Sequence, residues 1–179
     1  VVPVGDFAYR GNLFSALLAA ASATLVYSAS LSFCRYVRPR GPRYLWLVSA
    51  AVAGAIFATT PLLWSQATIT EVYALNAAFV GLLLVVAARL ALPQPSGRPL
   101  GDRTVTRGLA IFALIVGLGL GNHLTLLAVA LPLLLWLWLR LGWRSFTSPI
   151  VPAALILGLG IYVYLPLRAG QGPPVNWGN

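Results

Sequence analysis

Residues Trp64–Asn76 read WSQATITEVYALN and lie between two strongly apolar runs of the chain. This polar stretch carries Gln66, Thr68, Thr70, Glu71, Tyr73 and Asn76. Glu71 is one of only three acidic residues among 179. Polar and ionisable side chains at membrane depth are costly and commonly functional. We therefore interpret the apolar runs as the scaffold of a site built around this stretch.

The composition identifies an integral membrane protein. The chain is 59% hydrophobic and 8% charged, with a mean hydropathy of +0.85, whereas soluble domains are roughly 45–50% apolar. Its basic residues are twelve arginines and no lysine, which give a net charge of +9. These arginines lie in short loops between apolar runs and form no continuous basic face, so nucleic acid is excluded as a partner.

The apolar runs predict an all-α fold, a polytopic bundle of transmembrane helices that forms one domain over residues 1–179. Spanning helices need about 17–25 mostly apolar residues. Six apolar runs are candidates, over residues 12–34, 44–64, 70–92, 107–121, 124–139 and 149–167. The fourth and fifth are short, so they either meet in a break within the membrane at Gly121–His123 or border a recessed site.

The distribution of arginine predicts the orientation. The connections after the first, third and fifth helices hold ten arginines, and the opposite side holds only Arg10 and Arg168. Short cytoplasmic loops collect basic residues, so both ends of the chain are expected outside the cytoplasm. The same assignment places on the outer side the polar stretch together with Asn122, His123, Arg168, Asn176 and Trp177.

Within the polar stretch, Thr68 and Glu71 have the spacing of a capping box, in which each side chain bonds the backbone of the other. Glu71 is therefore either a helix cap or a group that binds ligand or handles a proton, and the two roles can coexist. At helical spacing Gln66, Thr70 and Tyr73 share one face. Tyr73 and Asn76 suit hydrogen bonds to a polar head group, although tyrosine is also a common interfacial anchor.

The segment GLGLGNH, which ends at His123, resembles a phosphate loop but follows no strand, so Gly117–Gly121 favours close helix packing or a kink. His123 is the only histidine, and no cysteine or histidine cluster accompanies it, so no metal site is predicted. Two interpretations remain for His123. It is a structural residue at a helix break, or it binds an anionic group or moves a proton.

Three residues near the C-terminus are further candidates. Arg168 runs against the charge rule, and its guanidinium suits bidentate binding of a phosphate. The alternative is that it snorkels to lipid head groups. Asn176 and Trp177 follow a Pro-Pro turn and either lie over a sugar ring or anchor the chain at the interface.

Four phrases together resemble a known family. They are PVGDFAYRGNLFSALLAA, WSQATITEVYALN, GLGLGNHLT and YLPLRAGQGPPVNWGN. In order and spacing they are similar to the family labelled domain of unknown function 2723, which includes the transmembrane-protein-260-type protein O-mannosyltransferases. The resemblance implies a glycosyltransferase of the GT-C class. It would transfer a mannose-like sugar from a polyprenyl-phosphate carrier to a protein or glycan acceptor on the non-cytoplasmic side.

The resemblance also implies roles for individual residues. The substrate-binding set would comprise Gln66, Glu71, Tyr73, Asn76, Asn122, His123, Arg168, Asn176 and Trp177. The catalytic carboxylate of such enzymes is expected upstream of Val1, and Asp6 does not match it. The chain is therefore expected to be an internal piece of a longer protein, inactive alone. Its implied partners are membrane lipid, the lipid-linked sugar and the acceptor; a role for a divalent metal stays open.

Two other functions remain as alternatives. In a transporter, the short fourth and fifth helices would be discontinuous elements around a substrate. In a non-catalytic module, the outer polar residues would only contact lipid head groups. The basic residues are all arginine, which favours a bacterial inner membrane with a periplasmic active face over an endoplasmic reticulum membrane with a lumenal one.

Overall fold

The computed structural model describes residues 5–69, 71–93 and 100–171. Every regular element in these ranges is helical. Five helices are long and apolar enough to cross a membrane, and the bent pair of α2 and α3 makes a sixth candidate. The predicted all-α transmembrane bundle is confirmed.

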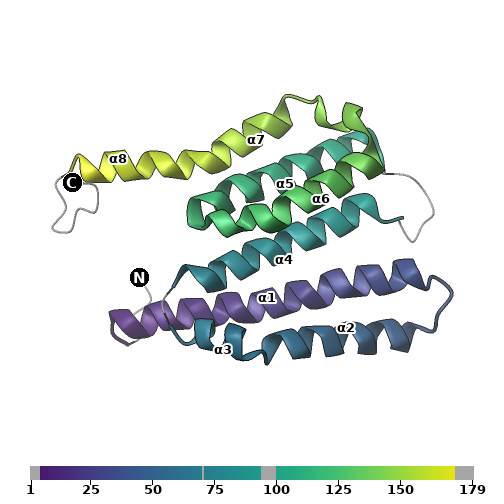
Figure 1. Cartoon of the computed structure of the whole chain (residues 1–179), viewed down its shortest axis with the longest axis horizontal. Coiled ribbons are helices and arrows are strands. Elements are labelled where there is room, and N and C mark those ends of the chain that lie inside the picture. The colour runs from purple at the N-terminus through teal and green to yellow at the C-terminus, as the bar shows by residue number, and fades with distance from the viewer. Residues whose placement is uncertain (1–4, 70, 94–99, 172–179) are drawn as a thin grey trace.

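The helices follow one another back and forth along one axis (Figure 1). In order they are α1 Phe7–Val37, α2 Arg43–Ala58, α3 Pro61–Ala67, α4 Val72–Ala91, α5 Asp102–Asn122, η1 Leu124–Leu126, α6 Leu127–Leu141, η2 Trp143–Phe146, α7 Ile150–Leu159, η3 Gly160–Val163 and α8 Tyr164–Ala169. Helix α1 packs against α2 and α4, α4 against α5 and α6, and α5 against α7. The core lies between α4, α5 and α6, where Leu83, Leu109, Leu126 and Leu137 are almost completely buried.

The second apolar run differs from the single helix expected over 44–64. It breaks after Ala58, and α2 and α3 are bent by 61°. Pro61 begins α3, and proline disrupts a helix that would continue through it. The hydroxyl of Thr60 accepts a hydrogen bond from the Leu63 N–H at 3.4 Å and donates to the Phe57 carbonyl at 2.9 Å. Thr60 thus caps the start of α3 and also donates a hydrogen bond to a carbonyl at the end of α2.

Helix α5 begins at Asp102, well before the expected start at residue 107. The expected start was late because the first turns of α5 are polar and do not belong to the apolar run. With 21 residues, α5 is long enough to span, as is the 18-residue segment Leu124–Leu141. The expectation that the fourth and fifth helices are short is wrong. The break between them is present, since α5 ends at Asn122 and η1 starts at Leu124.

Glycine allows the backbones of α5 and α7 to touch. A Cβ atom on Gly117 would lie 2.5 Å from the carbonyl oxygen of Leu155 and 2.9 Å from the Cα of Gly158. A Cβ atom on Gly158 would meet the carbonyl oxygen of Leu114 at 2.6 Å. Small residues let transmembrane helices approach closely. The helix-packing interpretation of Gly117–Gly121 is confirmed.

The predicted capping box is wrong. Thr68 is the C-cap of α3, and its hydroxyl donates to the carbonyls of Ser65 at 3.0 Å and Trp64 at 3.4 Å. Glu71 is the N-cap of α4 but makes no side-chain capping hydrogen bond. The two residues belong to different helices, so they cannot bond reciprocally. Asp6, by contrast, caps α1, because its Oδ1 accepts from the Tyr9 N–H at 2.8 Å.

We expect Gly158→Ala to lower the free energy of unfolding by about 1–3 kcal/mol, because the added methyl group overlaps backbone atoms that cannot move aside. Gly160→Ala is the matched control, since a Cβ there meets nothing within 4 Å. Thermal unfolding in detergent measures both. Equal unfolding temperatures for the two variants would contradict the close contact of α5 and α7.

The two acidic N-caps make a second test. Asp6→Ala should cost about 0.5–2 kcal/mol, because a capping hydrogen bond is lost. Glu71→Ala should change stability by no more than about 0.5 kcal/mol, as expected for a surface side chain that makes no capping hydrogen bond with the described residues. The measurement is again thermal unfolding of the two variants side by side. A larger loss for Glu71→Ala would restore its capping role.

Candidate functional site

The polar residues of interest gather at one end of the bundle. Figure 1 shows that α3, the start of α4, the turn between α5 and α6, and α8 all lie toward this end. The connections from α1 to α2 and from α6 to α7, the end of α4 and the start of α5 lie at the other end, which holds most of the arginines in the described residues. We refer to Tyr73, Asn76, Asn122, His123 and Thr125 as the polar cluster.

Direct contacts join the first turns of α4 to the end of α5 and to η1. The side-chain amide of Asn122 donates from Nδ2 to the Val72 carbonyl at 3.0 Å. The rings of Tyr73 and His123 have centroids 5.4 Å apart and are inclined by 45°. Because Tyr73 and Asn76 are three residues apart, both face the α5–η1 junction.

His123 occupies the break itself. It is the C-cap of α5 and the N-cap of η1, with an extended backbone at φ −158° and ψ 131°. Its Nδ1 accepts a hydrogen bond from the backbone N–H of Thr125 at 3.3 Å and lies 2.7 Å from the Thr125 Oγ1. The backbone N–H of His123 bonds the Gly119 carbonyl at the end of α5, and the side chain caps the start of η1. Nε2 makes no hydrogen bond with the described residues.

Thr125 is a member of the cluster that the sequence analysis did not single out. Its Oγ1 lies 3.3 Å from Nδ2 of Asn76, which donates to it across the helix boundary. A hydroxyl two residues after a cap residue commonly bonds back to the cap. That spacing, histidine followed by threonine at a helix break, was the available signal.

Two amide oxygens are left without partners. Oε1 of Gln66 and Oδ1 of Asn76 are buried and accept no hydrogen bond from the described residues. Such a group costs about 1–3 kcal/mol, and unsatisfied polar atoms in native proteins often mark functional sites. Gln66 lies on α3, not on the helix of Tyr73, so the two do not form the expected stripe. Thr70 lies outside the described residues.

The other predicted residues are less closely associated. Glu71 is exposed at the start of α4. Arg168 is exposed on α8, and the Arg168 Nη1 donates to Gln171 Oε1 at 2.9 Å. Helix α8 packs mainly on η3 and extends past the α5–α6 turn (Figure 1). Arg168 thus lies toward the same end without belonging to the polar cluster. Asn176 and Trp177 lie outside the described residues.

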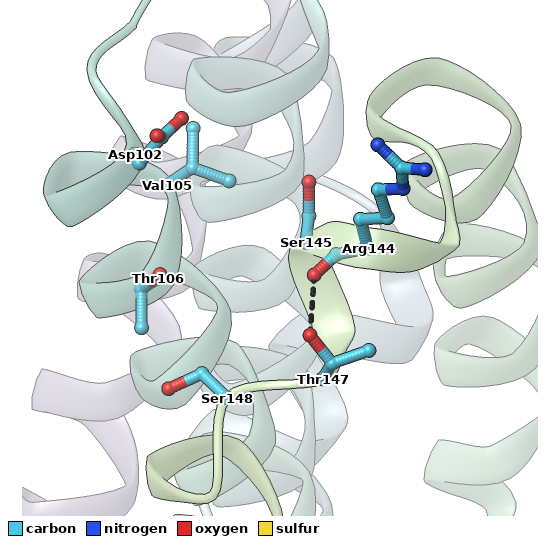
Figure 2. A pocket seen from close by; sticks show the side chains of 7 residues that line it. All are labelled: Asp102, Val105, Thr106, Arg144, Ser145, Thr147 and Ser148. Atoms are coloured by element: carbon cyan, nitrogen blue, oxygen red, sulfur yellow. Dashed lines mark hydrogen bonds between the residues drawn. The ribbon is translucent and has the colours of Figure 1, made fainter.

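A cavity of about 430 Å³ lies at the arginine-rich end instead. Figure 2 shows the start of α5 on one wall and the connection from α6 to α7 on the other. Its lining residues are Asp102, Val105, Thr106, Arg144, Ser145, Thr147 and Ser148. None of them is a predicted site residue, and the Thr147 hydroxyl is already bonded to the Arg144 carbonyl at 2.8 Å. We place the candidate site at the polar cluster, which contains the unsatisfied amide oxygen of Asn76.

Comparison with known proteins gives the family. The chain is 29% identical over 171 residues to the mouse (Mus musculus) protein named Protein O-mannosyl-transferase TMEM260. The match covers 93% of this chain and 22% of that relative, so the chain spans about a fifth of its length. No solved structure matches the chain. Residues 1–147 match the family described as Protein O-mannosyl-transferase TMEM260 N-terminal domain, and the chain therefore belongs to this family.

Proposed function

We propose that this chain is part of a membrane glycosyltransferase. It transfers a mannose-like sugar from a polyprenyl-phosphate carrier to a protein or glycan acceptor on the non-cytoplasmic side. Family membership supports sugar transfer. The observation that carries the choice of site is the meeting of α4, α5 and η1 in one hydrogen-bonded polar cluster, at the end of the bundle away from most arginines.

The charge distribution supports the proposed orientation. Arg35 ends α1, Arg89 ends α4 and Arg140 ends α6, all at the same end of the bundle. Basic residues of short loops stay in the cytoplasm. The polar cluster then faces the periplasm of a bacterial inner membrane, or the lumen if the membrane is that of the endoplasmic reticulum.

The side chains of the cluster have the chemistry that a sugar requires. Amide, imidazole and phenol groups donate and accept hydrogen bonds without fixed charge, as sugar hydroxyls demand. Tyr73 is 45% exposed, so part of its side chain is available to pack on a sugar ring. Arg168 supplies the positive charge for the phosphate of the carrier.

These roles fit an inverting transfer. A hydroxyl of the acceptor attacks the anomeric carbon, the bond from that carbon to the phosphate oxygen breaks, and a carboxylate takes the hydroxyl proton. Arg168 stabilises the negative charge that develops on the departing lipid phosphate, and His123 contributes a hydrogen bond. We assign the carboxylate to a residue outside the polar cluster, because the cluster contains no acid.

We expect Arg168→Ala to reduce sugar transfer by at least about 10-fold, because a charge that stabilises the leaving phosphate is lost. Arg103→Ala is the matched control, an exposed arginine at the opposite end, and should leave transfer within about 2-fold. The assay measures transfer from polyprenyl-phosphate mannose in membranes containing the complete protein. Equal rates for the two variants would remove Arg168 from the mechanism.

The orientation predicts the outcome of cysteine labelling. In a Cys34→Ser background, a cysteine replacing the exposed Thr68 should react with an impermeant maleimide from the non-cytoplasmic side. A cysteine replacing the exposed Arg103 should react only after the membrane is opened. The reverse pattern would place the polar cluster in the cytoplasm and contradict transfer from a carrier on the outer side.

A further inference from the structure

We propose that Thr125 is a positioning residue. Its hydroxyl, oriented by Asn76, holds His123 as a neutral imidazole with its proton on Nε2, so that the ring donates a hydrogen bond to an oxygen of the sugar-phosphate donor. The identity of this ligand depends on the function proposed above. The proton position is a separate claim that follows from the hydrogen bonds alone.

The backbone N–H of Thr125 contacts Nδ1 of His123. It lies 3.3 Å from Nδ1 of His123 in hydrogen-bonding geometry. A backbone N–H only donates, so this contact forms only when Nδ1 presents its lone pair and carries no proton. At 3.3 Å it is the longer of the two contacts to Nδ1 and favours that tautomer weakly; the Thr125 hydroxyl at 2.7 Å is needed to hold it. A neutral imidazole with a bare Nδ1 has its proton on Nε2.

The hydroxyl of Thr125 completes a directional chain. Its Oγ1 lies 2.7 Å from Nδ1, and because Nδ1 is an acceptor, the hydroxyl hydrogen points toward it. The lone pairs of Oγ1 are then free to accept from Asn76 Nδ2 at 3.3 Å. Donation runs from Asn76 to Thr125 to His123, and each donor in this chain has an acceptor.

As a result, the Nε2–H group of His123 is available to donate a hydrogen bond to the ligand. Nε2–H makes no hydrogen bond with the described residues, and the ring is only half-buried, with Tyr73 against it. A nitrogen that carries a proton does not act as a general base. Of the two functional interpretations of His123, binding of an anionic group is favoured over moving a proton.

A purely structural role makes a different prediction. Ending α5 requires the backbone N–H of His123 on the Gly119 carbonyl, and starting η1 requires only the backbone N–H of Thr125 on Nδ1. That contact survives any change of the Thr125 side chain. The hydroxyl and Asn76 are needed only if the proton position on His123 matters, which makes Thr125→Val and Thr125→Ser a discriminating pair. Valine keeps the shape and loses the hydroxyl, whereas serine keeps the hydroxyl.

The experiment reads the tautomer of His123 directly. The complete protein, with ¹⁵N-labelled histidine, is placed in nanodiscs, and the His123 signals are identified by their loss in His123→Asn. Long-range ¹H–¹⁵N spectra distinguish Nδ1 from Nε2. We expect the proton on Nε2 in the unmodified protein and in Thr125→Ser, and a mixture of tautomers in Thr125→Val and Asn76→Leu. Transfer should fall about 10-fold in kcat for Thr125→Val and recover in Thr125→Ser.

Two ligand probes identify the acceptor oxygen. A polyprenyl phosphate without sugar and a soluble mannoside without phosphate are added separately. A shift of the Nε2 signal with the first assigns the hydrogen bond to phosphate, and a shift with the second assigns it to the sugar. Either result supports the donor role, and no shift with either probe overturns it.

A proton on Nδ1 in the unmodified protein overturns the proposal, as does a Thr125→Val spectrum identical to that of the unmodified protein. The two proposals can fail separately. If the unmodified protein transfers no sugar, the proposed function is rejected. If His123 in that protein still has the Nε2 tautomer and loses it in Thr125→Val, the positioning role remains supported.

Discussion

In a bilayer every backbone N–H and C=O must find a partner within the protein. The helices of this chain meet that requirement along their lengths, and it becomes difficult only where a helix ends. The polar side chains collect at those ends because they complete the backbone there. Thr60 satisfies both sides of the α2–α3 bend, and His123 does the same between α5 and η1. The candidate site is therefore built around a residue, His123, at which one helix ends and the next begins.

The lengths of the apolar runs were sufficient to predict the bundle, because the thickness of the hydrocarbon core sets the length of a spanning helix. They were insufficient for the ends of the helices. The α2–α3 bend depends on Pro61 and on hydroxyls that add little to hydropathy, and the early start of α5 lies in a polar turn. The capping box failed for a related reason. The spacing of Thr68 and Glu71 was correct, but Thr68 ends one helix and Glu71 precedes the next.

The composition of the site was partly predictable from sequence. Tyr73, Asn76, Asn122 and His123 were selected as polar residues near helix ends, and the structure brings them together through bonds between α4 and the α5–η1 junction. Arg168 was selected on charge alone, and its helix does not join that group. Thr125 was overlooked because its local signal, a threonine two residues after a histidine at a helix break, is weak beside an apolar run. Its importance comes from Asn76, a residue on another helix that no local pattern reveals.

The contact between Gly117 and Gly158 has a mechanical consequence. One of these helices ends at the imidazole and the other leads on toward the guanidinium of α8. With backbone against backbone there is no soft side chain between them to absorb a displacement. A shift of α7 toward α5 therefore meets backbone atoms directly, so the position of the His123 imidazole depends on how closely these two helices pack.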